Sequence, residues 1–254
     1  MKPRIAIVRL VVKILLLHFL VAPVVSPQTA KTKKRMPYMD SSLSIERRVN
    51  DLLSRMTLPE KIAQLESDIR DIDEKPIPYD TGLGGLGPVL RPLVPREAAE
   101  KANALQRQAR EKTRLGIPLI IHDEGLHGLV GKGATSFPQS IALASTWDDS
   151  LMLRVAAAIG KETRARGIRQ LLSPVINIAR DTRWGRVEET YGEDTYLTTR
   201  MGVAFCKGVE GEGVITTPKH FAANVGDGGR DSYPIHFSER LLREVYFPAF
   251  KACF

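Results

Sequence analysis

Apolar residues recur every three to four positions in several stretches of this chain, which is the pattern of an amphipathic helix. In the clearest stretch, 95–112, the residues Ala99, Ala102, Leu105 and Ala109 fall on one side of such a helix. The same periodicity predicts helices at 149–167, at 195–209 and from Ser238 onward, and a pair of helices within 42–70.

Residue types that start or stop helices support these boundaries. Thr57 and Glu60 have the spacing of a capping box, with Pro59 early in the helix. Gly167 stands where a helix commonly ends in a left-handed residue, and Ser238 stands where a side-chain oxygen can cap a helix start. The predicted helices therefore have signals at their ends as well as periodic faces.

Short apolar runs without helical spacing predict strands between the helices. The runs at 117–121 and 171–178 have the continuous apolar character of buried strands. A glycine-rich stretch at 82–88 is interpreted as a short first strand, and a run at 213–217 as the last one.

Strands alternate with helices along the chain, which indicates parallel strands joined by crossover helices. Polar clusters follow three of the strands, at 122–128, 180–194 and 219–231, as in barrels whose sites lie at the carboxyl ends of the strands. We therefore predict an α/β fold, an incomplete (β/α)8 TIM-type barrel with about the first four βα units, preceded by the helical pair. A doubly wound sheet is the alternative, although no GxGxxG motif follows a first strand.

The first 30 residues differ from the rest of the chain. Basic residues precede an apolar run at 14–25, and Ala30 follows it, which is typical of a secretory signal peptide over 1–30. The run contains His18 and Pro23 and is short for a spanning helix, so an uncleaved membrane anchor is the weaker alternative. The signal predicts a secreted or periplasmic protein with no stable membrane association after cleavage.

Two further segments follow the predicted signal. Residues 31–44 are predicted to be a disordered start of the mature chain, and 45–254 to be the barrel domain. The last predicted helix is still amphipathic at Phe254, with no glycine, proline or polar tail after it. We therefore expect the barrel domain to be truncated.

The formal charge of +8 would suggest nucleic-acid binding if it were spread over the folded part. Residues 1–37 hold eight of the 37 Lys and Arg residues and no acidic residue, which leaves 29 basic and 29 acidic residues elsewhere. The predicted domain is therefore neutral, and we exclude nucleic acid as a partner.

Only two cysteines, Cys206 and Cys253, occur in the chain. This number argues against a disulfide scaffold, and Cys206, with apolar neighbours on a predicted helix, is expected to be a buried free thiol. No cluster of Cys and His has the spacing of metal ligands, so we predict neither a metal nor a cofactor.

The candidate chemistry is concentrated in 173–194, SPVINIARDTRWGRVEETYGED. A short β-branched strand here breaks into a loop with three arginines, five acidic residues and Trp184. Charged side chains after a strand are how α/β enzymes place polar groups at the carboxyl edge of a sheet. A solvated loop of salt bridges is the alternative interpretation.

Several motifs in this order resemble glycoside hydrolase family 3, the β-glucosidase and β-xylosidase type. The resemblance runs from about Val49 to the end of the chain. It rests on Glu124 with His127-Gly128, on RDTRWGR at 180–186 followed by ETYGED at 189–194, on KHF at 219–221 and on SER at 238–240.

The resemblance implies that four residues bind the terminal sugar of a substrate: Glu124, Arg186, Lys219 and His220. Sugar hydroxyls are donors and acceptors, so a carboxylate can accept from two of them while Arg and Lys donate to their oxygen atoms. Structural roles are the alternatives: a helix cap for Glu124, an ion pair with Glu188 or Glu189 for Arg186, and core packing for His220.

Other polar residues of these motifs are expected to support the site. His122 and His127 are interpreted as structural residues that orient their loop. Trp184 is interpreted either as a face for sugar stacking or as packing beneath the loop. Two arginines are expected to pair with acidic residues of the same loop: Arg180 and Arg183 with Glu189, Glu193 and Asp194.

The resemblance also implies the reaction, retaining hydrolysis of terminal β-linked sugars by a carboxylate nucleophile and a second carboxylic acid. The family's nucleophile lies in a motif that does not occur in this sequence, and its usual acid/base comes from a later domain. We therefore assign no catalytic residue and expect this chain alone to be inactive. A non-catalytic carbohydrate-binding relic of the same fold is the alternative from another functional class.

Glu124 stands where the β-glucosidase branch of the family usually has Asp, which resembles the β-xylosidase branch. The longer side chain reaches toward the space of a sugar's C6 hydroxymethyl group. One methylene is worth only about 1–3 kcal/mol of discrimination, so both substrates stay open. The N-acetylglucosaminidase branch carries a His in the loop after KHF, and we set it aside because 222–229 contains none.

Overall fold

The computed structural model describes residues 36–69, 77–226 and 234–254 and divides the chain into two units, Met1–Arg55 and Met56–Phe254. The predicted signal peptide, 1–30, lies outside the described residues. Within the described ranges, no helix is both long and apolar enough to cross a membrane.

The described part of the first unit is a short 3-10 helix, η1 (Pro37–Met39), followed by α2 (Ile45–Arg55). Asp51 on α2 accepts a hydrogen bond from the backbone N–H of Tyr38, and Arg48 donates to the Tyr38 carbonyl oxygen. These two bonds tie η1 to α2. Of the segment predicted to be disordered, the structure describes residues 36–44, which include η1.

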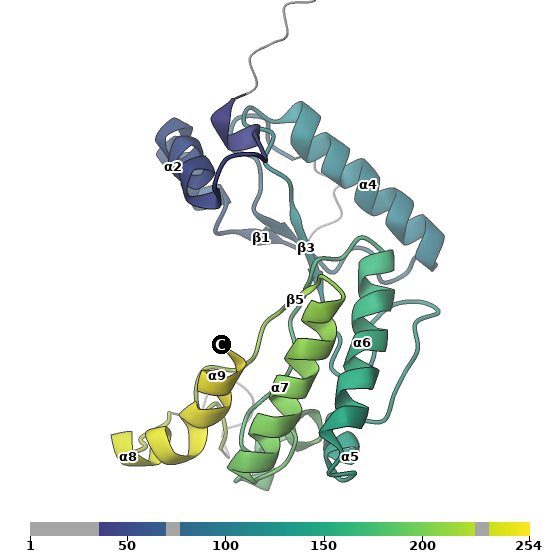
Figure 1. Cartoon of the computed structure of the whole chain (residues 1–254), viewed down its shortest axis with the longest axis vertical. Coiled ribbons are helices and arrows are strands. Elements are labelled where there is room, and N and C mark those ends of the chain that lie inside the picture. Colours follow the sequence, from purple (N-terminus) through teal and green to yellow (C-terminus); the bar gives the residue numbers. More distant parts are fainter. Residues whose placement is uncertain (1–35, 70–76, 227–233) are drawn as a thin grey trace, which may run out of the picture. The chain divides into compact units, whose positions relative to one another are not determined.

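The second unit is built on a parallel sheet whose strands lie in sequence order, β1-β2-β3-β4-β5. Figure 1 labels β1, β3 and β5 of this sheet. Every neighbouring pair is parallel, which confirms the predicted α/β fold with a parallel sheet. The strands are short: β1 (Ser67–Asp68), β2 (Gly85–Leu86), β3 (Ile120–Asp123), β4 (Gln170–Leu171) and β5 (Ile215–Thr216).

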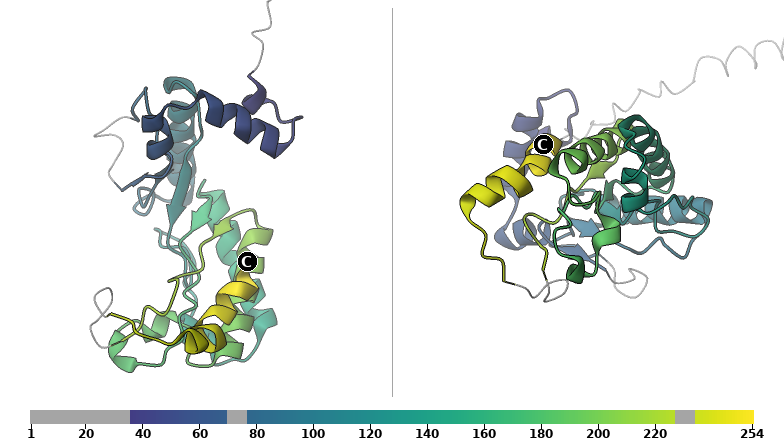
Figure 2. Two further views of the ribbon diagram at one scale, coloured as in Figure 1. Left: turned by 90° about the vertical axis from the view of Figure 1, so that its left-hand side faces the viewer. Right: turned by 90° about the horizontal axis from the view of Figure 1, so that it is seen from below.

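Long helices connect the strands from β2 onward. They are α4 (Pro95–Lys112) between β2 and β3, α6 (Asp149–Ala165) between β3 and β4, and α7 (Thr195–Gly211) between β4 and β5. Figures 1 and 2 show α6 and α7 side by side, with α9 next to α7. The shorter elements are α3 (Leu58–Ala63), α5 (Ser140–Ala144), η2 (Thr182–Trp184), η3 (Val187–Glu189), α8 (Glu239–Leu241), the π-helical η4 (Leu242–Tyr246) and α9 (Phe247–Cys253).

Two clusters of buried apolar side chains hold this unit together. The larger one joins the sheet to the helices, for example through Leu86, Ile121, Leu171 and Phe205, each fully buried. The smaller one includes Trp184 of the loop after β4. Val175, Ile178 and Tyr246 are among its other buried members. The loop that carries the candidate chemistry is therefore anchored by its own core.

Three residues predicted to start or end helices are confirmed in these roles. The Thr57 hydroxyl accepts from the Glu60 N–H while the Glu60 carboxylate accepts from the Thr57 N–H, as a capping box requires. Gly167 follows α6 with φ +85, in the left-handed region that glycine favours. The Ser238 side chain accepts from the N–H of Leu241 and caps α8.

Two predicted boundaries are wrong. The second helix of the pair within 42–70 ends at Ala63, and Ser67–Asp68 forms β1, a strand that precedes the one predicted at 82–88. The strand predicted over 171–178 ends at Leu171. Pro174 has no N–H to donate to a ladder, and beyond it only an isolated bridge pairs Val175 with Lys219.

Candidate functional site

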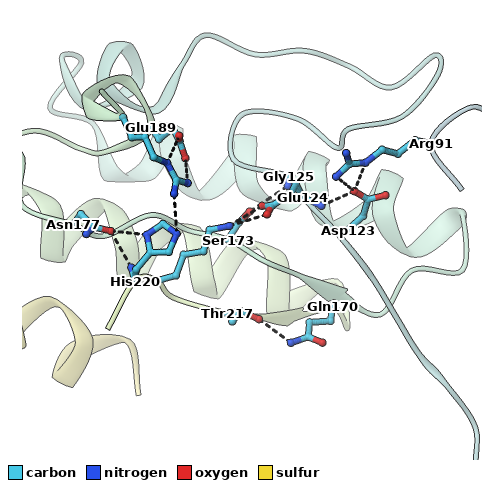
Figure 3. A network of polar contacts seen from close by, with 12 residues as sticks. Arg91, Asp123, Glu124, Gly125, Gln170, Ser173, Asn177, Glu189, Thr217 and His220 are labelled. Atoms are coloured by element: carbon cyan, nitrogen blue, oxygen red, sulfur yellow. Dashed lines mark hydrogen bonds and ion pairs between the residues drawn. The ribbon is translucent and has the colours of Figure 1, made fainter. Parts of the chain in front are cut away.

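Three segments that follow β3, β4 and β5 meet at the carboxyl edge of the sheet. The strands are in register there, with Asp123 opposite Leu171 and Leu171 opposite Thr216. Because the strands are parallel and adjacent, their next residues leave the sheet at the same edge. Figure 3 shows that Glu124, after β3, and His220, after β5, lie in one polar network that includes Asn177 from the segment after β4.

Glu124 and Lys219 form the first contact of this network. The Lys219 Nζ atom donates to both carboxylate oxygens of Glu124, over 2.8 Å to Oε1 and 3.0 Å to Oε2. The lysine side chain is 16% exposed and the glutamate side chain 32%. The pair is thus partly desolvated yet still accessible, so its lone pairs and remaining N–H groups can reach a polar ligand.

Arg186 and Glu189 form the second contact. The guanidinium binds the carboxylate in a bidentate manner, with 2.6 Å from Nε to Oε1 and 2.6 Å from Nη2 to Oε2. Burial acts to raise the pKa of Glu189, but the hydrogen bonds and charge of Arg186 and the nearby charge of Lys219 together outweigh it, so the pKa lies below its ordinary value. Glu189 is therefore ionised and holds the arginine plane in one orientation.

His220 connects the Arg186 contact to the segment after β4. Its Nδ1 atom lies 3.0 Å from Asn177 Oδ1, and its backbone N–H donates to the same oxygen over 2.9 Å. The Asn177 Nδ2 group donates to the Asn224 carbonyl, which leaves Oδ1 as the acceptor. Nδ1 therefore carries the proton, and Nε2 is free to accept from Arg186 Nη1 at 3.2 Å in the neutral ring.

Trp184 lies beneath Arg186 and His220. The guanidinium carbon is 5.7 Å from the centre of the indole, and the imidazole meets the indole edge to face, with ring centroids 6.5 Å apart. The ring is 1% exposed. Of the two interpretations of Trp184, packing beneath the loop is confirmed, because a ring this buried has no face for a sugar.

Asp123 and Arg91 are members of the network that sequence reasoning missed. Asp123 is 2% exposed, and its Oδ1 atom accepts from the Glu124 N–H at 2.7 Å and from Arg91 Nε at 2.8 Å. Burial raises the pKa of Asp123, and Arg91 acts against that change. Ser173 Oγ accepts from the N–H of Gly125 at 3.2 Å. Together these bonds position the backbone that carries Glu124.

Asn177 was also missed as a member of the site, since it had no signal beyond its place in the polar part of 173–194. Glu189 was expected either to pair with Arg180 and Arg183 or to form the ion pair given as the structural alternative for Arg186, and that ion pair is present. The assignment to Arg183 is wrong, because Arg186 binds Glu189 while Arg183 binds Asp181, with 2.6 Å from Nη2 to Oδ2.

The remaining residues of these motifs have structural contacts. Asp194 caps α7 by accepting from the N–H of Leu197. His127 Nδ1 lies 2.9 Å from the Phe137 carbonyl oxygen and so ties two parts of its loop. His122 Nε2 lies 2.6 Å from Ser67 Oγ of β1, and burial lowers the pKa of its imidazole. These contacts agree with the structural roles expected of the two histidines.

The four residues predicted to bind sugar are thus brought together in two neighbouring pairs, Glu124 with Lys219 and Arg186 with His220. Within the described ranges, no group of three or more His, Cys, Asp or Glu side chains is arranged to hold a metal ion. The arrangement offers carboxylate acceptors beside fixed cationic donors, which is the complement of vicinal hydroxyl groups.

Comparisons with known proteins point to one family. Residues 57–254 match the N-terminal domain of glycosyl hydrolase family 3. A β-xylosidase of Formosa agariphila is 35% identical over 248 residues, which cover 90% of this chain and 27% of that protein. A periplasmic β-glucosidase of Salmonella typhimurium is 32% identical and covers 80% of this chain and 27% of that protein.

A solved structure shows the same likeness. A β-glucosidase from Erythrobacter marinus superimposes with a TM-score of 0.80 at 34% identity, over 86% of this chain and 31% of that one. The chain spans less than a third of the length of these relatives.

Proposed function

Because this chain belongs to glycosyl hydrolase family 3, we propose that it carries the sugar-binding part of the active site of a retaining, exo-acting β-glycosidase. That enzyme removes terminal β-linked glucose or xylose from oligosaccharides or glycosides. The relatives include β-xylosidases and β-glucosidases, and the similar solved structures include β-glucosidases, which supports this substrate class.

The observation that carries the proposal is the side-by-side arrangement of the Glu124–Lys219 and Arg186–His220 contacts at the ends of β3 and β5. A sugar hydroxyl can donate to the Glu124 carboxylate and accept from Lys219, and the next hydroxyl can accept from Arg186 or His220. The contact network holds each of these side chains before a ligand arrives. A preorganised site of this kind binds a small polar ligand at a low entropic cost.

The catalytic groups of such a reaction are a carboxylate nucleophile and a carboxylic acid. We assign neither to a residue of this chain. Glu189 is held by Arg186 and Asp123 by Arg91, so each of these buried or half-buried carboxylates already has a cationic partner. We therefore propose that this 254-residue chain supplies sugar-binding residues of the active site but does not hydrolyse the glycosidic bond by itself.

The strand order supports a barrel as the larger architecture. The five strands follow one another without a reversal, whereas a doubly wound sheet reverses its order at a switch point. We propose that 45–254 belongs to a (β/α)8 barrel, that 1–30 is a signal peptide and that the protein acts outside the cytoplasm. The periplasmic relative from Salmonella typhimurium supports that location.

The test compares the complete gene product with the 254-residue chain on aryl β-glucoside and aryl β-xyloside. We expect hydrolysis by the complete product and none by the chain. Hydrolysis by the 254-residue chain that Lys219→Met abolishes would contradict the proposal that this chain contains no catalytic carboxylate. Saturable sugar binding by the complete product without any turnover would instead support the carbohydrate-binding relic.

A further inference from the structure

The two cysteines of this chain face each other between α7 and α9. Cys206 lies on α7 and is 3% exposed, whereas Cys253 lies at the end of α9 and is only partly buried. Both are free thiols in this structure. They are far apart in the sequence, so their meeting is a product of the packing of α9 on α7 that Figures 1 and 2 show.

A glycine on α7 makes room for this meeting. Gly202 precedes Cys206 by one helical turn and lies on the same face, and helical side chains lean toward the N-terminal end of their helix. A Cβ atom added at Gly202 would lie 3.5 Å from Cys253 Sγ. The Cys253 sulfur therefore occupies the part of the helix surface toward which the Cys206 side chain points.

The protonation of the two thiols agrees with this geometry. A hydrogen bond from Cys253 holds the pKa of Cys206 below its ordinary value, and the same bond raises the pKa of Cys253. The two groups therefore titrate as a pair, and the proton that remains after the first is lost is shared between the two sulfur atoms. A thiolate is the species that attacks a disulfide.

We propose that Cys206 and Cys253 are a site of intramolecular disulfide formation that links α7 to α9. The oxidant is an external disulfide, of which oxidised glutathione is an example. The pair loses a proton, first from Cys206, and the remaining proton can pass along the hydrogen bond from Cys253 to Cys206. The thiolate then present at the partly exposed Cys253 attacks one external sulfur and expels the other as a thiolate. Cys206, once deprotonated, attacks the Cys253 sulfur and expels the second external thiolate.

The step is balanced. Two protein thiols lose two protons and two electrons and become one disulfide, and the external disulfide takes up both and becomes two thiols. Such a bond persists in oxidising compartments. It would hold α9, which is followed by the exposed Phe254, against the long helix α7. The inference is independent of the sugar-binding proposal, because none of the residues involved belongs to the candidate site.

The experiment incubates the whole chain with oxidised glutathione at neutral pH, blocks free thiols with an alkylating reagent and digests the product with trypsin without reduction. We expect the peptide Met201–Lys207 to be joined to the peptide that begins at Ala252, two hydrogen atoms lighter than the two separate peptides. Recovery of both cysteines as alkylated or singly glutathionylated peptides would overturn the proposal.

A matched control tests whether the disulfide forms because folding brings the two thiols together or because they collide at random. The double variant Cys253→Ser with Lys251→Cys keeps nearly the same spacing in the sequence but moves the second thiol to an exposed position of α9. In a strong denaturant the two proteins should cross-link at similar rates. Under native conditions we expect the intramolecular disulfide to form on the order of tenfold faster, or more, in the wild-type chain than in the variant. The reason is that folding raises the effective concentration of one thiol near the other. Equal native rates would refute the proposal.

Discussion

The ammonium group of Lys219 lies 2.8 Å and 3.0 Å from the two carboxylate oxygens of Glu124, across 95 residues of sequence. The two residues follow β5 and β3, which are separated in the sheet by β4 alone. This pair therefore links the two outer segments of the candidate site. It also keeps both charges ready for a ligand in a partly buried place.

The variant Lys219→Met tests the role of this pair. We expect kcat/KM of the complete gene product toward aryl β-glycosides to fall on the order of 100-fold, because a charge-assisted donor is lost and Glu124 is left without its partner. The exposed Lys251 is the matched control, and Lys251→Met should leave kcat/KM unchanged. Equal effects of the two variants would show that Lys219 does not contact the substrate.

Substrate choice is tested by Glu124→Asp. Removing one methylene opens space where a C6 hydroxymethyl group would lie, so the ratio of kcat/KM for aryl β-glucoside to that for aryl β-xyloside should rise. One methylene corresponds to a change of roughly 10-fold to 200-fold in this ratio. An unchanged ratio, measured with the complete gene product, would remove the steric argument for a xyloside preference.

The pKa of Glu189 reports on the Arg186 contact. Because hydrogen bonds from Arg186 lower this pKa against the effect of burial, Arg186→Gln should raise it, as measured by carbon-detected NMR titration of the carboxyl group. Arg183→Gln is the control, since Arg183 binds Asp181 instead. A rise in both variants would mean that the loop as a whole, and not the Arg186 contact, controls Glu189.

The pH dependence of stability should depend on Glu60. Hydrogen bonds from Arg114 lower the pKa of this buried carboxyl from 4.5 to about 2. A carboxyl with a lowered folded-state pKa stabilises the fold above its unfolded value, and this contribution is lost as the pH falls from 4.5 to 2. We expect Glu60→Gln to reduce the free energy of unfolding at pH 7 by roughly 1–2 kcal/mol, and the difference to vanish toward pH 2.

The control for this prediction is Glu244→Gln. Glu244 forms an ion pair with Arg240, and both side chains are mostly exposed. Such pairs contribute little, so urea denaturation of this variant should match that of the wild type at each pH. A difference between Glu60→Gln and wild type that stays constant from pH 7 to pH 2 would contradict the role assigned to the Arg114 contact.

Replacing glycine by alanine at two positions, Gly84 and Gly211, should change the free energy of unfolding in opposite directions. A Cβ at Gly84 would collide with the backbone carbonyl of Gln64, so Gly84→Ala should lower the free energy of unfolding by about 2 kcal/mol or more. Gly211 is the last residue of α7, and apart from its chain neighbours and the backbone of its own helix, no atom of the described residues lies within 4 Å of an added Cβ. Gly211→Ala should stabilise the protein by about 0.5–1 kcal/mol, as urea denaturation would show.

Helix periodicity and capping residues predicted the structure correctly, because both depend on residues that are close together in the sequence. Pro95–Lys112 is a helix over the predicted residues, and Thr57, Gly167 and Ser238 act as the predicted caps. Capping and periodicity depend on residues within a few positions of one another, so they are visible in the sequence. β1 was missed because two residues, Ser67–Asp68, carry no periodicity and form a strand only by pairing with β2.

The sequence by itself determined the α/β class, the parallel sheet and the family, since alternating elements and ordered motifs are properties of the chain. Only the tertiary structure decided that Arg186, and not Arg183, holds Glu189, that Lys219 meets Glu124, and that Trp184 is buried. The physical reason is that these contacts depend on strand register and on how one loop packs over its core. Both are set by interactions between residues far apart in the sequence.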